Sequence, residues 1–269
     1  MPLSSPMPPL KASEGNVKRF QSILISGASS GIGTALAEVF AEPGVTLFLG
    51  GRSRERLAAV AEACRARGAT VETTAVDVTD RAAMAAWIAE ADRLKPIDLV
   101  IANAGISGGT LKGTEKEEKT RQIFATNLDG VMNTVFPALP GMRERKAGQI
   151  GLMSSLAAFR GFPGAPAYGA SKAAVKVWGE SLRGDLSPKG IGVSVIMPGF
   201  VKSPMTDRNK FPMPFLMTAD RAAGIVRRGL ERNQGRIAFP FPTAFLAWFA
   251  GMLSPALIDP FLMKLPKKD

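Results

Sequence analysis

The chain has 269 residues, of which 46% are apolar and 21% charged, so it can build one sizeable core, and a single domain is the simplest expectation. With no histidine and a single cysteine, the sequence excludes a Ser-His-Asp triad, His-based or thiolate metal sites, and disulfides within the chain. The formal net charge of +11 can attract anionic partners, but the cations are scattered with no aromatic-interleaved basic stripe, so nucleic-acid binding is not expected.

The N-terminal residues 1–15, MPLSSPMPPLKASEG, contain four prolines and no apolar period. This composition predicts a flexible arm. The segment lacks the uninterrupted apolar run of a secretory signal peptide, so none is expected.

Strand and helix signals alternate after the arm. Strands are predicted at 22–25, 45–49, 70–76, 97–102, 150–153, 193–197 and 236–239. Helices are predicted at 31–40, at 53–67 with Gly68 as a left-handed stop, from a Thr79 cap onward with Met84, Trp87 and Ile88 on one face, and at 169–186. The segments 97–102, 150–153 and 193–197 are almost wholly apolar, as parallel strands buried on both faces are. The fold class is therefore a doubly wound, Rossmann-like α/β domain with three αβα layers, whose ligands bind beyond the carboxyl ends of the strands.

Cys64 falls at helical spacing with Leu57, Val60 and Ala61, so it is expected in the core. Such sparse use of cysteine fits a reducing cytoplasm, which is the predicted location.

The stretch ILISGASSGIGTALAEVF, residues 23–40, leads a strand into a glycine-rich turn and a helix. Residues 27–31 fit G-x-S-x-G, the elbow that presents a nucleophilic serine, here Ser29. Gly27, Gly31 and Gly33 also fit a loop whose backbone approaches a pyrophosphate at a helix N-terminus. An ordinary tight turn is the third interpretation. Because no histidine exists to activate Ser29, the phosphate loop is favoured.

The spacing Gly-x-x-x-Gly-x-Gly resembles the cofactor turn of the short-chain dehydrogenase/reductase family. Asn103-Ala104-Gly105 resembles that family's N-A-G motif, Asp77 its acidic residue beside the adenine, and Pro198-Gly199 its segment at the nicotinamide end, with the match running from about residue 20 to 240. The resemblance implies a cofactor site composed of Gly27, Ser29, Ser30, Gly31, Ile32, Gly33, Arg52, Asp77, Val78, Asn103, Ala104, Gly105, Tyr168, Lys172, Pro198, Gly199, Val201 and Ser203.

Tyr168 is the only tyrosine, and Lys172 follows one helical turn later on the same face. An adjacent ammonium favours the phenolate. Lowering the phenol pKa by about 2–3 units corresponds to roughly 3–4 kcal/mol, more than one exposed pair supplies, so the positive charge of a bound nicotinamide must contribute.

The family resemblance implies a catalytic set of Asn127, Ser155, Tyr168 and Lys172. Ser155 lies thirteen residues before Tyr168, the family's distance, whereas Ser154 is the rival serine. Tyr168 is then the general acid in reduction and the base in oxidation, and Ser155 donates a hydrogen bond to the reacting oxygen. Lys172 binds the nicotinamide ribose and depresses the Tyr168 pKa. Asn127 supports a water relay, or is merely a polar helix residue with its own backbone partner.

The end of the second strand bears on cofactor choice. Gly51 stands where NAD-dependent family members have an acidic residue, and Arg52 follows it. Arg52, assisted by Ser53 or Arg54, can pair with a 2′-phosphate, which predicts NADP(H) as preferred cofactor and leaves NAD(H) as the alternative. In the other interpretation Arg52 is a solvated charge at a helix start.

Two apolar segments bear on the substrate, and the second departs from the family pattern. The segment 203–217, in the place of the family's mobile lid, is rich in Met and Phe and favours a bulky, lipid-like substrate. The extension 243–269, which follows a catalytic domain at 16–242, has an uncharged helical part too short to span a bilayer. It covers the substrate pocket or a dimer seam, lies on a membrane surface, or is plain core. Lys264, Lys267 and Lys268 are either contacts for anionic headgroups or simply solvated.

The sequence thus predicts an NADP(H)-dependent oxidoreductase that interconverts a ketone and a secondary alcohol. The alternatives are a catalytically silent NADP-binding sensor or scaffold and a peripheral membrane-surface protein. Because the family pairs subunits through the long helices that carry Asn127 and Tyr168, the resemblance implies a homodimer or homotetramer.

Overall fold

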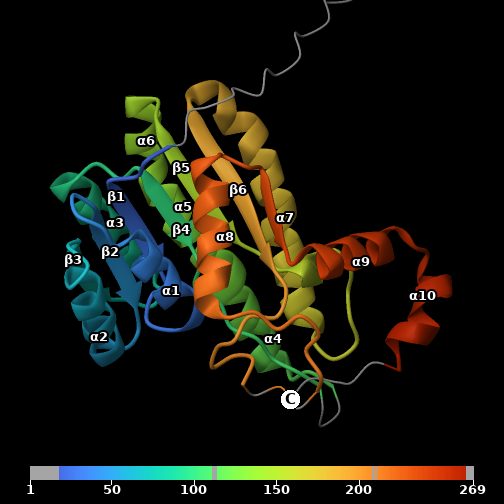
Figure 1. The fold of residues 1–269 in the computed structure, drawn as a ribbon. Helices are drawn as coiled ribbons and strands as arrows, with labels where there is room; N and C mark the ends of the chain where they lie inside the picture. The colour runs from blue at the N-terminus through green and yellow to red at the C-terminus, as the bar shows by residue number, and fades with distance from the viewer. Residues whose placement is uncertain (1–17, 111–113, 208, 210, 265–269) are drawn as a thin grey trace, which may run out of the picture.

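The computed structural model describes residues 18–110, 114–207, 209 and 211–264, so the predicted arm at 1–15 lies outside the described residues. Within this part of the chain all seven strands of the sheet pair in parallel, in the order β3-β2-β1-β4-β5-β6-β7 (Figure 1). The strands are β1 Ser22–Ser26, β2 Thr46–Gly51, β3 Thr70–Ala75, β4 Leu99–Ala102, β5 Gly148–Met153, β6 Ile191–Pro198 and β7 Arg236–Phe239.

Helices cover both faces of this sheet (Figure 1). The helices are α1 Gly31–Phe40, α2 Arg54–Arg65, α3 Arg81–Leu94, α4 Glu117–Phe124, α5 Gly130–Val135, α6 Leu139–Arg145, α7 Pro166–Leu186, α8 Ala219–Glu231, α9 Phe241–Met252 and α10 Pro255–Leu262. Short helical turns are η1 Ala125–Asp129, η2 Phe136–Ala138, η3 Leu156–Ala158 and η4 Ser187–Lys189.

Alternate residues of β1 belong to two separate hydrophobic clusters, because successive side chains of a strand point to opposite faces. Ile23 and Ile25 of β1 join a cluster with apolar residues of α1, α2 and α8. Leu24 of the same strand joins the cluster formed with α3, α5 and α7. The three-layer αβα fold predicted from the sequence is therefore confirmed, as is the core position of Cys64, where burial raises the thiol pKa to about 11.

The predicted helix cap at Thr79 is wrong by one residue. Asp80 is the N-cap of α3 and accepts the Ala83 N–H at 3.0 Å. Thr79 instead donates its N–H and its hydroxyl to the Asp77 carboxylate, at 2.9 and 2.8 Å. Asp and Thr both cap helices. Thr79 does not cap this one, because its hydroxyl donates to the Asp77 carboxylate.

The chain reverses its direction of sheet growth between β1 and β4. From β1 the order runs outward through β2 to β3, whereas β4 starts the other half on the opposite side of β1. The carboxyl ends of β1 and β4 therefore flank the switch point, where open α/β sheets form their ligand crevice. None of the described helices has the length and apolar character needed to cross a membrane.

Candidate functional site

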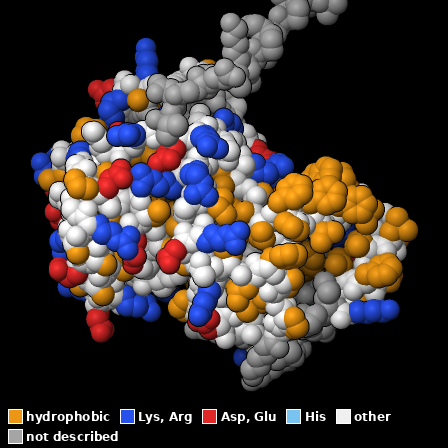
Figure 2. All heavy atoms as spheres, viewed as in Figure 1, with side chains coloured by type: hydrophobic (Ala, Val, Ile, Leu, Met, Phe, Trp, Pro, Cys, Tyr) orange, Lys and Arg blue, Asp and Glu red, His pale blue; other side chains and the backbone are white. Residues whose placement is uncertain are grey.

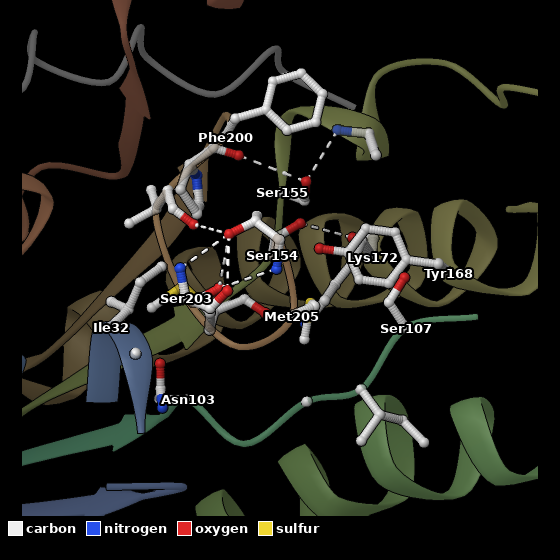
Figure 3. Close-up of a pocket in the computed structure, with 18 of the residues that line it drawn as sticks. Ile32, Asn103, Ser107, Ser154, Ser155, Tyr168, Lys172, Phe200, Ser203 and Met205 are labelled. Carbon is white, nitrogen blue, oxygen red and sulfur yellow. Dashed lines mark hydrogen bonds between the residues drawn. The ribbon is translucent and has the colours of Figure 1, made fainter. Parts of the chain in front are cut away.

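A cavity of about 760 Å³ lies beyond the carboxyl ends of the central strands. Its walls come from the β1–α1 turn, the ends of β2, β4, β5 and β6, the first turns of α7, the 203–217 segment and α9. Figure 3 shows residues that line it, among them Asn103, Ser155, Tyr168 and Ser203. Of the predicted cofactor and catalytic residues, Asn127 is the one absent from the cavity lining in the described chain.

The glycine turn at one end is held tightly against the end of β4. Gly27 has φ +68°, and a Cβ built there would lie 2.7 Å from the Ala104 Cα. A Cβ on Gly33 would collide with the Gly27 carbonyl oxygen. The Asn103 amide donates to the Gly27 carbonyl at 3.0 Å. Side chains larger than hydrogen are therefore excluded at Gly27 and Gly33, and the turn keeps its close packing, with both glycines on the cavity lining.

The first turn of α1 faces the same end of the cavity. Ser30, its N-cap, makes no side-chain capping bond, and the first turn of this described helix contains no acidic residue. Free N–H groups and the positive end of the helix dipole therefore point at the cavity. A pyrophosphate fits this chemistry.

Two arginines border the cavity next to this turn. Arg52 follows β2, and Arg56 lies one helical turn further on. Of the predicted helpers, Ser53 accepts the Arg56 N–H as the N-cap of α2, and Arg54 is absent from the lining among the described residues. Arg56 lies in the first turn of α2, whereas Arg52 precedes the Ser53 N-cap, so no helical spacing in the sequence linked the two arginines.

Asp77 and Val78 line the cavity near these arginines. Burial tends to raise the pKa of Asp77, but the two hydrogen bonds from Thr79 and the charge of Arg52 outweigh it and lower that pKa. Asp77 is therefore ionised at neutral pH and partly balances the arginine charge.

Tyr168 and Lys172 project from one face of α7 into the other end of the cavity (Figure 3). The Lys172 Nζ is buried, donates to the Met153 carbonyl at 2.8 Å and lies 5.8 Å from the centre of the Tyr168 ring. Burial lowers the Lys172 pKa to about 8. The two side chains therefore lie together, as the i,i+4 spacing predicts.

The Tyr168 pKa differs from the sequence expectation. Burial raises it, and a hydrogen bond with Ser155 offsets only part of that rise. The expected depression by Lys172 does not dominate, because Lys172 is itself desolvated and directs its ammonium at a carbonyl oxygen. A further positive charge near the phenol is needed to bring its pKa down.

The two serines after β5 have different surroundings. Ser154 donates its hydroxyl to the Lys172 carbonyl within α7, at 2.8 Å. Ser155 is the serine hydrogen-bonded to Tyr168, and its oxygen also accepts the Ala157 N–H at 3.2 Å. Ser154 therefore anchors α7 to the sheet, and Ser155 faces the phenol.

Asn127 is fully buried in η1, a π-helical turn between α4 and α5. Its side chain exchanges two hydrogen bonds with the backbone of Ile106 and donates to the Ser171 hydroxyl at 3.0 Å. A Cβ on Gly105 would lie 3.3 Å from both Asn127 Oδ1 and Lys172 Nζ. Asn127 thus sits behind the lysine and fixes the loop that follows β4.

The segment that follows β6 forms one side of the cavity. Pro198, Gly199, Val201 and Ser203 line it. The segment is closed at its base, where the Met217 N–H donates to the Phe200 carbonyl at 3.0 Å and the Lys202 N–H donates to the Met217 carbonyl at 2.9 Å. Its apolar lining comprises Met205, Phe211, Pro212 and Pro214.

One face of α9 completes the apolar wall. Thr243, Leu246, Ala247 and Ala250 line the cavity. Sequence reasoning named the helix but not these four residues, because the run is apolar all round and has no polar face to orient it. Plain core is wrong for this segment, since Ala244 is the one buried residue among those described in α9.

Three kinds of comparison with known proteins agree with this arrangement. The family profile described as short chain dehydrogenase matches residues 21–212. An uncharacterized oxidoreductase of Myxococcus xanthus is 41% identical over 241 residues, 89% of this chain and 95% of that protein. A 3-oxoacyl-acyl-carrier-protein reductase of Thermotoga maritima is 34% identical over 190 residues, 69% of this chain and 76% of that protein. The crystal structure of levodione reductase is similar with a TM-score of 0.75 and 25% identity, covering 81% of this chain and 95% of that one.

Proposed function

Because the chain belongs to the short-chain dehydrogenase family, we propose that it is an NADP(H)-dependent oxidoreductase that interconverts a ketone and a secondary alcohol. The observation that carries the proposal is one cavity with a glycine turn and two arginines at one end and Tyr168, Lys172 and Ser155 at the other. A dinucleotide would contact both ends of this cavity, whereas the reacting carbonyl would contact only the end with Tyr168, Lys172 and Ser155.

The residues present fit a phosphorylated dinucleotide. Gly27 and Gly33 allow the turn to pack closely at the uncapped N-terminus of α1, and both line the cavity, which supports a pyrophosphate there. Arg52 and Arg56 supply guanidinium groups suited to a 2′-phosphate, and Gly51 offers no carboxylate to a 2′-hydroxyl. A bound reduced nicotinamide supplies the hydride.

The side chains of α7 and η3 handle the proton. In reduction the Tyr168 hydroxyl gives its proton to the carbonyl oxygen as that oxygen gains charge, and in oxidation the phenolate takes the proton back. Ser155 donates a hydrogen bond to the same oxygen. The Lys172 ammonium stabilises the phenolate. Asn127 links the loop after β4 to Ser171, the residue before Lys172 in α7.

The substrate class is a ketone carried on a bulky apolar chain. The 203–217 segment and α9 surround the Tyr168 end with Met205, Phe211, Leu246 and Ala250 and with few charges. The named activity of the Thermotoga maritima relative, on a 3-oxoacyl substrate, supports a keto group on an acyl chain.

The proposed location is the cytoplasm, with peripheral membrane contact, and the proposed assembly is a homodimer or homotetramer. The assembly is supported by Phe136 and Val177, two exposed apolar side chains close to α5 and on α7. These are the helices through which the resemblance implies pairing.

Substitution of Tyr168 by Phe tests the proposed chemistry. NADPH oxidation with a panel of apolar and polar ketones is expected to fall by about 10²–10⁴-fold in Tyr168→Phe, while NADPH binding, followed by its fluorescence, is retained. A wild-type protein that binds NADPH and reduces no ketone would instead identify a silent sensor. Retained turnover in Tyr168→Phe would overturn the assignment of Tyr168.

A further inference from the structure

The outer side of α9 and α10 exposes a continuous group of large apolar side chains (Figure 2). We call this group the outer apolar face, and its members are between 42% and 78% exposed: Phe241, Phe245, Leu246, Trp248, Phe249, Met252, Leu257 and Phe261. Phe245 lies at its centre, with ring centroids 5.8 Å from Trp248 and 6.4 Å from Phe249. A contiguous aromatic surface of this kind marks a contact with another body.

The face is held in place and is not a loosely attached tail. A Cβ on Gly251 would lie 2.5 Å from the Phe159 carbonyl oxygen, so α9 packs directly on the backbone after η3. Arg160 donates to the Leu253 carbonyl at 3.3 Å and pairs with Asp259 of α10 at 2.6 Å. Both helices are thereby fixed with their inner side on the cavity and their aromatic side outward.

The charges of this segment favour an anionic surface. Between residues 241 and 264 the only charged residues are Asp259 and Lys264, and the Asp259 carboxylate is matched by Arg160. Lys264 leaves the edge of the face positive, and the whole chain has a formal net charge of +11. A basic chain attracts anionic headgroups, so an anionic lipid surface complements the charge at this face.

The face also borders the cavity. Leu246 is 61% exposed and lines the cavity as well, and Ala247 and Ala250 of the same helix line it too. An apolar molecule that leaves a lipid layer at this face therefore meets an apolar wall leading to Tyr168.

We propose that the outer apolar face docks on an anionic phospholipid surface and admits the substrate from the lipid into the cavity. Docking itself is independent of the chemistry, but the route of entry rests on the proposed ketone reductase function. Aromatic and aliphatic side chains would insert at the headgroup level, with Lys264 at the phosphates, as amphipathic surface helices do.

The test is co-sedimentation of the full chain with vesicles of phosphatidylcholine alone or mixed with phosphatidylserine. Wild type is expected to bind the mixed vesicles, less with added salt, and the double variant Phe245→Glu with Phe249→Glu to bind at least about tenfold more weakly. Leu94→Glu is the matched control, because Leu94 is an equally exposed apolar residue on α3, and its binding is expected to match wild type. Circular dichroism and thermal unfolding check that each variant folds.

Wild type that stays in solution with mixed vesicles, or a double variant that binds as well as wild type, would overturn the proposal. Self-association that the double variant loses, without vesicle binding, would assign the face to a second copy instead. Failure of the docking proposal can be told apart from failure of the proposed function. Wild type and the double variant are expected to reduce a water-soluble ketone equally, whatever their vesicle binding. If wild type binds vesicles but reduces no ketone of the panel, the proposed function is overturned while the docking proposal stands.

Discussion

At the scale of single residues, Lys172 occupies a proposed catalytic position, and burial of its charge lowers the free energy of unfolding. Its ammonium is almost fully buried, and burial lowers its pKa from 10.5 to about 8. Between these two values the unfolded chain binds more protons than the folded one, so stability rises with pH through this window. Below about pH 8 the full cost of burying the charge is present.

Lys172→Met is therefore expected to raise the free energy of unfolding near neutral pH by on the order of 2 kcal/mol while abolishing turnover. Urea unfolding at about pH 7 and about pH 9.5 measures this, and the stability gap between variant and wild type is expected to close at the higher pH. A variant that is less stable than wild type at both pH values would contradict the assigned cost.

Arg52 decides cofactor preference in the proposed site. Arg52→Asp is expected to lower the preference for NADPH over NADH by about 10–100-fold, because a charge-assisted pair with the 2′-phosphate is replaced by repulsion. Steady-state kinetics with both cofactors measure the ratio. Arg54→Asp is the matched control, since Arg54 is exposed at the same helix start but does not line the cavity. An unchanged preference for NADPH over NADH in Arg52→Asp would contradict the assignment of Arg52 to the 2′-phosphate.

At the scale of elements, α7 carries two of the predicted catalytic side chains, Tyr168 and Lys172, and must lie close to the sheet. A Cβ on Gly179 would lie 2.6 Å from Leu152 Cδ1 and 2.7 Å from Val195 Cγ2, whereas a Cβ on Gly184 of the same helix would meet nothing within 4 Å. Gly184→Ala is expected to stabilise the protein by about 0.5–1 kcal/mol and Gly179→Ala to destabilise it by about 1–3 kcal/mol. Thermal unfolding checks both, and equal midpoints would contradict this packing.

The sequence predicted strands better than it predicted the segments between them. Buried parallel strands are almost uniformly apolar, so their signal is local, and the strand at 236–239 was placed without error. The helices between β4 and β5 were not predicted individually, since they are short and divided by η1. Arg56 was not predicted as a cavity residue, because its position on the cavity wall depends on where α2 begins. The lining face of α9 depends on tertiary packing against η3.

At the scale of the whole molecule, the exposed side chains beside α7 bear on assembly. Phe136 is 53% and Val177 59% exposed, and the Phe136 ring lies 5.8 Å from that of Trp178. This patch belongs to the side of α5 and α7, separate from the outer apolar face on α9 and α10. Two copies related by a twofold axis would bury the patch on both chains at once.

The double variant Phe136→Asp with Val177→Asp is therefore expected to separate the subunits. Each substitution would place a carboxylate in the contact twice, once from each chain, and burying an unpaired charge costs several kcal/mol. Light scattering after size exclusion is expected to give the mass of two or four chains for wild type and of one chain for the variant. Since Gly27, Arg52, Tyr168 and Lys172 of the same chain line one cavity, the separated variant is expected to keep NADPH binding. Its turnover is expected to fall, because Val177 lies on the helix that holds Tyr168 and Lys172, and a free α7 positions them less firmly. A monomeric wild type, or a variant that stays assembled, would show that this patch is not the interface.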